Sequence, residues 1–307
     1  MTALSQETPG IEAGAAAETP FRRILADFLA SKLAVAGLAA LAAIAFVALF
    51  APWISPQNPY DLATLDLLDG RLPPGSASAD GGLTYWLGTD DQGRDMLSAI
   101  FYGLRTSLAV GGLSAGLALV IGTTLGLIAA YIGGRVESLI MRLVDLQLSF
   151  PAILVALILV ALMGQGAAKI ILALVAVQWA YFARTVRGSA LVERRKEYVE
   201  AARCLALSDA RIMLHHLLPN CLPPLIVVLT VQVAHAVALE ATLSFLGIGL
   251  PITEPSLGLL IANGFEYMMS GKYWISLFPG VALLVAIMSI NLVGDRLRDV
   301  LNPRLQR

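Results

Sequence analysis

The stretch RGSALVERRKEYVEAARCLALSDARIMLHHLLPN, residues 187–220, separates two apolar segments, 170–186 and 222–247. Each apolar neighbour has at least the roughly 17 residues that a helix needs to cross the hydrocarbon of a bilayer. The stretch between them is polar and charged, so it lies outside that hydrocarbon. A loop of this length between two membrane spans is where we expect function to be concentrated.

The composition of the whole chain is typical of a membrane protein. Of the 307 residues, 57% are hydrophobic and 14% are charged, and the mean hydropathy is +0.75, whereas soluble domains carry about 25% charged residues. The formal net charge of -1 provides no basic surface for a nucleic acid. Cys204 and Cys221 lie far apart, without the spacing of a zinc site or support for a disulfide.

Six segments are apolar and long enough to span a membrane: 33–51, 108–132, 143–163, 170–186, 222–247 and 275–293. In lipid each span must satisfy its own main-chain hydrogen bonds, which predicts helices, while a barrel would show short alternating strands. The predicted fold is therefore an all-α integral membrane protein with six transmembrane helices. We divide the chain into a disordered cytoplasmic tail (1–20), an N-terminal region with the first span (21–53), an outer loop with an amphipathic helix (54–107), a core of five spans (108–297) and a C-terminal tail (298–307).

The positions of Lys and Arg predict which side of the membrane each loop faces. If the N-terminus is cytoplasmic, the outer segments hold only Arg71, Arg94, Arg105, Lys169 and Lys272 of the 21 basic residues. The others then fall in cytoplasmic segments, as the positive-inside rule requires. We therefore expect both termini and the loop 187–220 to be cytoplasmic.

The outer loop closes on the sequence WLGTDDQGRD, residues 86–95. Thr89 followed by Gln92 has the spacing of a capping box, which predicts that a helix begins here and runs into the second span. Asp90 and Asp91 would then lie near the positive end of that helix. The alternative is that the segment contacts a partner protein or gates the outer mouth of a pathway, through Asp90, Asp91, Arg94 and Asp95. The three carboxylates lack the alternate oxygen ligands of a calcium loop.

The cytoplasmic loop carries apolar residues at nearly helical intervals between 193 and 220, which predicts two short amphipathic helices. Ser208 or Asp209 would cap the second helix, and Pro219 would end it. A charged helix-turn-helix on this side is suited to dock into a cleft of a soluble partner. The alternative is a solvated connector that has no partner.

These residues carry a family resemblance. Glu200-Ala201-Ala202 followed by Leu218-Pro219 resembles the EAA loop of ABC importer permeases, whose pattern is EAA, three residues, Gly, nine residues, Ile, any residue and Leu-Pro, and the spacing matches in full. Ala206 stands where Gly is usual and His216 where Ile is usual. An alanine at a turn that needs positive φ would cost roughly 1 kcal/mol or more, so the bend would shift or rest on Ser208 and Asp209.

The resemblance extends over about residues 22–304. WLGTDDQGRD (86–95), MRLVDLQLSFP (141–151), the segment 197–220 and ATLSFLGIG (241–249), in this order, are similar to the C-type permease of dipeptide, oligopeptide and nickel importers. That family implies a bacterial inner-membrane heterodimer with a related B-type permease, two cytoplasmic ATPases that hold ATP and Mg²⁺, and an extracytoplasmic substrate-binding protein. No P-loop is present in the sequence, so ATP hydrolysis would be left to the ATPases.

The resemblance also implies roles for particular residues. The segment that couples to the ATPases would contain Glu200, Ala201, Ala202, Arg203, Leu205, Ala206, Ser208 and Asp209. Within the spans, Glu240 is an ionisable residue with no adjacent cation, and such residues are costly in a membrane. It would either face the translocation pathway, together with Gln178 and Gln232, or bond to a neighbouring helix.

Small residues along the second span indicate close helix packing. Gly112 and Gly116, and again Gly122 and Gly126, have the spacing of small-residue packing motifs. The contacts would form within the chain or with a partner permease.

Three other functions are weighed against a peptide importer. Nickel importers share the same permease motifs, and the absence of a His- or Met-rich lining favours peptide over nickel. An ion-coupled secondary transporter would show inverted repeats, broken helices and several ionisable groups at mid-membrane depth. A membrane enzyme would need a nucleophile with its base, or a metal cluster, and the three histidines offer neither.

Overall fold

The computed structural model describes residues 20–61, 63 and 65–301. The predicted N-terminal tail, 1–20, lies outside these residues apart from Pro20. Among the residues described, five helices are long and apolar enough to cross a membrane, and the number is six if two helices with a bend between them count as one span. The five are α2 (Lys32–Ile54), α3 (Met96–Ile132), α6 (Ala167–Glu193), α9 (Leu218–Phe245) and α11 (Trp274–Leu301).

The third predicted span, 143–163, is broken. The structure places helix α4 (Gly134–Ser149) and helix α5 (Ala152–Met163) at 92° to one another. Phe150 between them is extended, with φ -97° and ψ 143°, because the ring of Pro151 disfavours a helical conformation in the residue before it. The prediction of one continuous helix here was wrong, because the predicted span was drawn across this bend.

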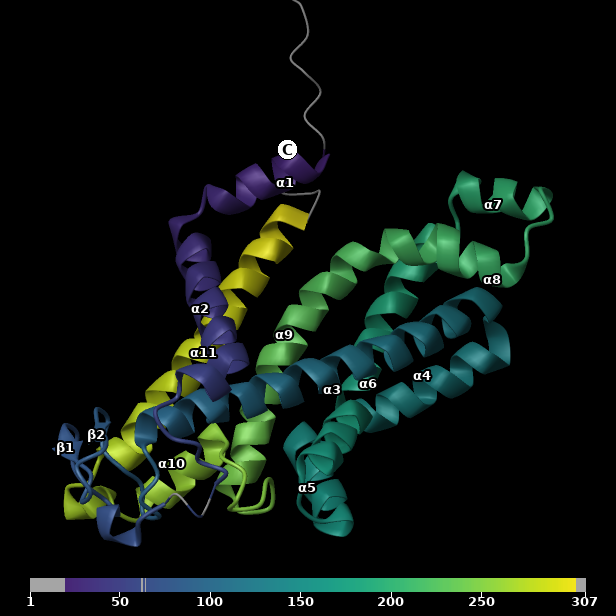
Figure 1. The fold of residues 1–307 in the computed structure, drawn as a ribbon. Helices are drawn as coiled ribbons and strands as arrows, with labels where there is room; N and C mark the ends of the chain where they lie inside the picture. Colours follow the sequence, from purple (N-terminus) through teal and green to yellow (C-terminus); the bar gives the residue numbers. More distant parts are fainter. Residues whose placement is uncertain (1–19, 62, 64, 302–307) are drawn as a thin grey trace, which may run out of the picture.

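The second span is part of a longer helix, as predicted, but this helix, α3, begins at Met96 and not at the segment around Thr89, and it has 37 residues. Figure 1 shows α3 running from the end of the molecule that carries β1 (Ser76–Ala77) and β2 (Thr84–Tyr85) to the end that carries α7 (Glu197–Cys204). It packs against α6 and α9. At Gly122 a side chain would place its Cβ 2.3 Å from the carbonyl oxygen of Trp179, so the two helices approach closely here only because this residue is glycine.

The glycine motifs of α3 differ in their contacts. Gly126 also lies against the main chain of α6, near Ala183, whereas Gly112 and Gly116 have nothing within 4 Å of an added Cβ. One of the two predicted packing motifs is therefore used inside the chain, and the other faces outward.

The loop 187–220 leads into α9 without a break. Helix α8 (Asp209–Arg211) and the π-helical segment η3 (Ile212–Leu217) continue directly into α9, so Pro219 does not end the second helix as predicted. A π-helical turn is wider than an α-helical one and interrupts the regular hydrogen-bond pattern. The missing N–H of Pro219 falls just after this irregularity and is accommodated there.

The outer end of the molecule contains elements that the sequence did not predict. β1 and β2 form an antiparallel hairpin that pairs Ser76 with Tyr85. A short 3₁₀ turn, η2 (Leu67–Asp69), precedes the hairpin. Helix α10 (Leu257–Phe265) and a 3₁₀ turn, η4 (Met268–Ser270), lie between α9 and α11. At the opposite end, helix α1 (Pro20–Leu29) precedes α2 and contributes Phe28 to a small cluster with Ala34 and Val300.

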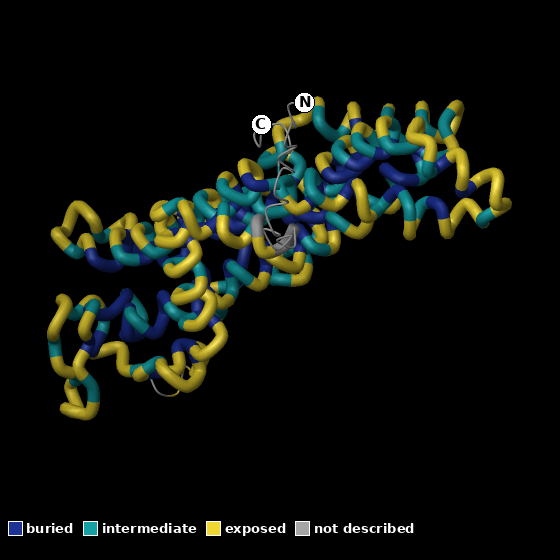
Figure 2. Tube along the Cα trace, turned by 90° about the horizontal axis from the view of Figure 1, so that it is seen from above, coloured by how far each residue is buried: buried dark blue, intermediate teal, exposed yellow. Residues whose placement is uncertain are grey.

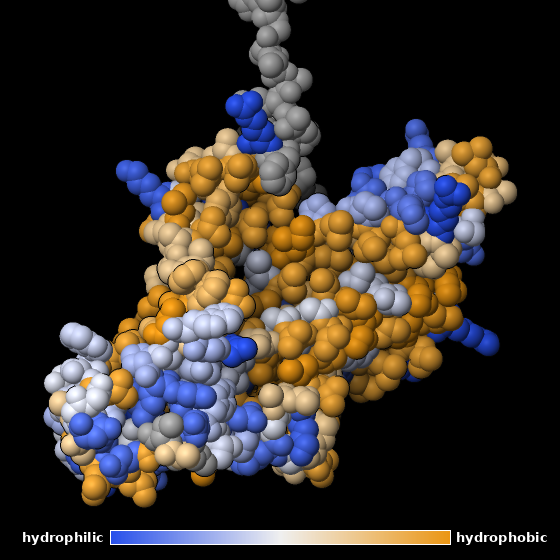
Figure 3. Space-filling model, in the orientation of Figure 1, coloured by the Kyte–Doolittle hydropathy of each residue, from blue (hydrophilic) through white to orange (hydrophobic). Residues whose placement is uncertain are grey.

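The surface divides into an apolar middle and two polar ends. Figure 3 shows hydrophobic residues over the long helices, and hydrophilic residues over β1 and β2 at one end and over α7 and α8 at the other. Figure 2 shows buried residues along the faces of the helices that contact one another and exposed residues on the outside. The exposed side chains of α2 and α5 include Phe46, Leu49, Ile158 and Leu162. An exposed apolar surface with polar ends is the surface of a membrane-spanning protein.

Candidate functional site

The loop 187–220 is held to the membrane helices by a buried apolar face. Val199 and Ala202 of α7 and Ile212 and Leu217 of η3 belong to one hydrophobic cluster with residues of α3, α6 and α9. Ala202 is only 3% exposed, so it faces this cluster and offers no surface to a partner. Ala202 therefore packs the loop against the membrane helices, and its place in the predicted coupling segment stays a prediction.

The opposite face of the same loop is open. Glu200, Ala201, Arg203 and Ala206 are exposed, and Leu205 is 74% exposed. Ser208 and Asp209 are exposed as well. The structure thus brings seven of the eight predicted coupling residues onto one exposed segment.

The turn after α7 places Ala206 in the left-handed region, with φ +53°. The N–H of Ala206 donates to the carbonyl of Arg203, and the N–H of Leu207 donates to the carbonyl of Ala202. This is the pattern of a Schellman motif, in which the left-handed residue is usually glycine. The bend therefore stays at the position that the motif spacing predicts, and Ser208 makes no side-chain capping bond.

An aromatic side chain connects the loop to α3. Tyr131, in the last turn of α3, donates a hydrogen bond of 2.5 Å from its hydroxyl to Asp209. The guanidinium of Arg203 lies 5.5 Å from the centre of its ring, and that of Arg194 lies 6.0 Å from it. Tyr131 was not predicted from the sequence. Its only signal is an aromatic residue at the predicted cytoplasmic end of a span.

A second tyrosine holds the start of the loop. The hydroxyl of Tyr198 donates to Glu193 at 2.8 Å and accepts from the amide of Asn220 at 3.2 Å. Burial and the neighbouring Glu193 carboxylate raise the pKa of Tyr198 to about 12. The phenol is therefore neutral at any physiological pH and bridges the end of α6 to the start of α9.

Glu240 is fully buried between helices. It accepts hydrogen bonds from the hydroxyls of Ser107 on α3, at 2.6 Å, and Ser244 on α9, at 2.8 Å. Of the two roles considered for this residue, the structure displays the bond to a neighbouring helix. A carboxyl group in the membrane interior with two donors avoids the cost of an unsatisfied polar group.

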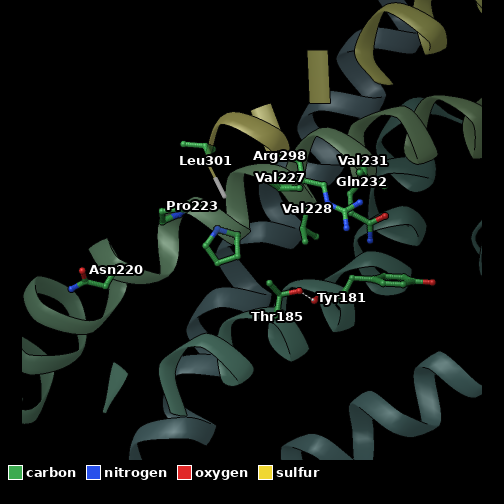
Figure 4. A pocket seen from close by; sticks show the side chains of 11 residues that line it. Tyr181, Thr185, Asn220, Pro223, Val227, Val228, Val231, Gln232, Arg298 and Leu301 are labelled. Carbon is green, nitrogen blue, oxygen red and sulfur yellow. Dashed lines mark hydrogen bonds between the residues drawn. The ribbon is translucent and has the colours of Figure 1, made fainter. Parts of the chain in front are cut away.

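The two glutamines expected in the pathway lie near one another. Gln178 of α6 is fully buried and donates to the main-chain carbonyl of Gln232 at 3.0 Å. Gln232 of α9 lines a cavity between α6, α9 and α11, which Figure 4 shows from close by. Of the three pathway candidates, Gln232 alone lines this cavity.

The outer segment 89–95 forms a buried polar cluster instead of the start of a helix. Asp90 and Arg94 are paired at 2.8 Å with both side chains almost fully buried, and Asp95 caps α3 by accepting from the N–H of Ser98. The predicted capping box is wrong, because the hydroxyl of Thr89 donates to the carbonyl of Asp69. Asp90, Arg94 and Asp95 give no exposed surface to a binding protein here, and only Asp91 is partly exposed.

The carboxyls of this outer end differ in their pKa. Burial opposes ionisation of Asp69, but hydrogen bonds from Ser78, Tyr85 and Ala79 outweigh it and lower the pKa of that carboxyl. Burial raises the pKa of Asp91, and the neighbouring Asp90 carboxylate raises it further. Asp69 is thus an ionised structural anchor. In the described part of the chain no group of three or more His, Cys, Asp or Glu side chains is placed to hold a metal ion.

The sequence and the fold match known proteins over most of the chain. A family model described as binding-protein-dependent transport system inner membrane component matches residues 122–307. A second model, the N-terminal TM domain of oligopeptide transport permease C, matches residues 19–74. A relative from Brucella suis biovar 1, provisionally named as a peptide transport system permease protein, is 42% identical over 88% of this chain and 87% of its own length.

Two further proteins resemble the chain, one in sequence and one in fold. The Di/tripeptide transport system permease protein DppC of Pseudomonas aeruginosa is 36% identical over 94% of this chain and 93% of its own length. A solved structure of the MetNI methionine ABC transporter, in an inward-facing conformation, aligns with 67% of this chain and 98% of the matched chain, with a TM-score of 0.55 and 21% identity. At 21% identity, the likeness to the MetNI structure concerns the fold alone.

Proposed function

The chain belongs to the binding-protein-dependent transport system inner membrane component family, and we propose that it forms one half of the pathway by which a bacterial ABC importer takes up di- and oligopeptides. A permease of such an importer works with ATPase subunits and a substrate-binding protein. The chain is a membrane permease and not an enzyme, so ATP and Mg²⁺ belong to the ATPases. The other half of the pathway would be a related B-type permease in a heterodimer.

The single observation that carries this proposal is that α7 has one buried face and one exposed face. Its inner face, with Val199 and Ala202, is buried against the membrane helices, while Leu205 and its neighbours on the outer face are exposed. A force applied to the outer face by a closing pair of ATPases would therefore pass into α3, α6 and α9. This arrangement fits alternating access driven by ATP, in which the two permeases rock against one another.

The remaining parts of the proposal follow from charge and from the relatives. The excess of basic residues in the loops on the side of α7 favours cytoplasmic N- and C-termini in the inner membrane. The two sequence relatives described above are named for peptides, which favours peptide over nickel. The break between α4 and α5 is a feature expected of secondary transporters, but the family match outweighs one bent span.

Leu205→Glu tests the proposal, with Leu67→Glu as its matched control. Both leucines are highly exposed, at 74% and 78%, and Leu67 lies in η2 at the outer end. We expect the unmodified tagged chain to co-purify with two ATPases and a second permease in mild detergent. Leu205→Glu should release the ATPases or reduce ATP-driven dipeptide uptake in proteoliposomes at least tenfold. Leu67→Glu should leave co-purification and ATP hydrolysis unchanged. Absence of any ATPase from the unmodified preparation, or full uptake by Leu205→Glu, would refute the proposal.

A further inference from the structure

A cavity of about 720 Å³ opens between α6, α9 and α11, on the half of the molecule that carries α7. Its walls include Thr185 of α6, Val227 and Val231 of α9, and Arg298 near the end of α11. Small-molecule sites in proteins commonly enclose about 300–1,000 Å³. The cavity therefore has the size of a ligand site, and nothing in the fold itself requires it.

The polar side chains of this cavity supply donors at Gln232 and Arg298, while Tyr181, Thr185, Asn220 and Gln232 also carry oxygens that accept. Gln232 is only 4% exposed, and its side-chain nitrogen has no hydrogen-bond partner among the described residues. In Figure 4 the amide of Gln232 and the guanidinium of Arg298 project toward the same part of the cavity, while Tyr181 contributes a phenol from α6. Among the lining residues that the structure describes there is neither Asp nor Glu.

An unpaired buried amide nitrogen costs free energy, so a ligand that accepts a hydrogen bond from it is favoured. Arginine matches the geometry of a carboxylate or phosphate and forms charge-assisted bonds to it. The valine and proline walls favour an apolar body behind that anionic group. The chemistry of the cavity thus fits a small molecule with an anionic end, a hydrogen-bonding part and an apolar part.

Building on the proposed function, we propose that this cavity binds a short peptide on its way through the membrane, with the C-terminal carboxylate at Arg298 and a peptide carbonyl at Gln232. A peptide supplies a main-chain acceptor for the amide nitrogen of Gln232 next to its carboxylate. A phospholipid also carries ester carbonyls and a phosphate, so a change of lipid distinguishes the two ligands. The permease then recognises the charged end that short peptides share, whatever their side chains.

Photolabelling of the complete transporter in nanodiscs tests this site. The probe is the dipeptide alanyl-p-benzoylphenylalanine with a free carboxylate, compared with its C-terminal amide, and mass spectrometry locates the label. We expect the acid to label the segment 223–232 about tenfold more than the amide does, the loss typical of a charge-assisted bond. Arg298→Gln should lower labelling by the acid about tenfold and leave labelling by the amide unchanged, and Arg298→Lys should restore part of it.

Matched controls separate recognition of the carboxylate from general effects. Arg135→Gln removes an exposed arginine that does not line the cavity and should leave the labelling by both probes unchanged. Gln232→Leu keeps the size of the side chain but removes its donor, and should weaken labelling by both probes. Normal ATP hydrolysis by each variant complex shows that it has folded and assembled.

Several results would overturn the site. The site is overturned if the acid and the amide label equally, or if labelling does not depend on Arg298. It is also overturned if no label falls in 223–232, or if this segment is crosslinked to the partner permease and not to the probe. Labelling that occurs in phosphatidylcholine discs and disappears in phosphatidylglycerol discs would assign the cavity to an anionic lipid headgroup. ATP-driven dipeptide uptake by the same preparation is read separately, so uptake without labelling removes this site and leaves the proposed function standing.

Discussion

Replacing Ala206 with glycine should stabilise the end of helix α7. Ala206 has φ +53° and occupies the left-handed position of a Schellman motif. For an L-residue with a side chain this conformation costs roughly 1–2 kcal/mol relative to glycine, and the greater freedom of glycine in the unfolded chain offsets part of the gain. We expect a net stabilisation of about 1 kcal/mol, which is a change of roughly fivefold in the local opening equilibrium.

Hydrogen exchange at the amide of Leu207 measures this change. That N–H bonds to the carbonyl of Ala202 across the turn, so it exchanges when the motif opens. In Ala206→Gly its exchange should slow about fivefold in the purified complex. Ala201→Gly is the matched control, because the same change inside the exposed face of α7 costs about 1 kcal/mol of helix stability and should accelerate exchange.

The opposite result would be decisive. If exchange at Leu207 is unchanged or faster in Ala206→Gly, the alanine holds no strain and the turn does not depend on the residue at this position. Slower exchange in both variants would point to a general effect of glycine on the purified complex.

Three other changes test the packing and the electrostatics. Gly122→Ala would place a Cβ 2.3 Å from the carbonyl oxygen of Trp179 and should destabilise the protein by about 1–3 kcal/mol. The loss is measured as a lower unfolding temperature in detergent. Gly112→Ala is the control, because its added Cβ meets nothing within 4 Å and should leave the unfolding temperature unchanged. The pKa of Asp69 is lowered below its ordinary value of 3.8. The stability that its carboxylate contributes to the outer loop is therefore complete above pH 3.8 and is lost as the pH falls through the lowered pKa. Protease resistance of the outer loop should drop on acidification, and Asp69→Asn should lack this pH dependence. Glu240→Ala leaves two serine hydroxyls without their acceptor and should cost about 1–3 kcal/mol of stability, measured by thermal unfolding. Glu240→Gln keeps an acceptor oxygen and should cost less. If Glu240→Gln assembles normally but loses uptake, the charge of Glu240 acts in the pathway.

The membrane helices were predictable because lipid forces each span to satisfy its own main-chain bonds. The predicted spans 33–51 and 275–293 lie within α2 and α11. The predicted span 143–163 was drawn across the bend between α4 and α5, although α4 is amphipathic and only α5 is uniformly apolar. Pro151 was the local signal for it, through its effect on the residue before it.

The coupling loop was predictable in position but less so in orientation. The EAA spacing located α7 and its turn. The bend was expected to shift or to rest on Ser208 and Asp209, but it stays at Ala206, which adopts a left-handed conformation. Which alanine faces inward depends on the packing of α7 against residues of α3 and α6, so the burial of Ala202 could not be predicted from the motif spacing. The hydroxyl of Thr89 looked like a helix cap because its true partner, the carbonyl of Asp69, is distant in sequence.

The bond from the indole of Trp274 to the carbonyl of Thr89, at 3.2 Å, bears on how the protein is made. The two residues are separated by 185 positions, and Trp274 begins the last membrane helix. During synthesis the N-terminal part of the chain emerges first, so the outer segment waits, incomplete, until the final helix has entered the bilayer. Closure of this contact therefore requires that α11 has entered the bilayer, and a nascent chain that stops before residue 274 leaves the segment 89–95 incomplete.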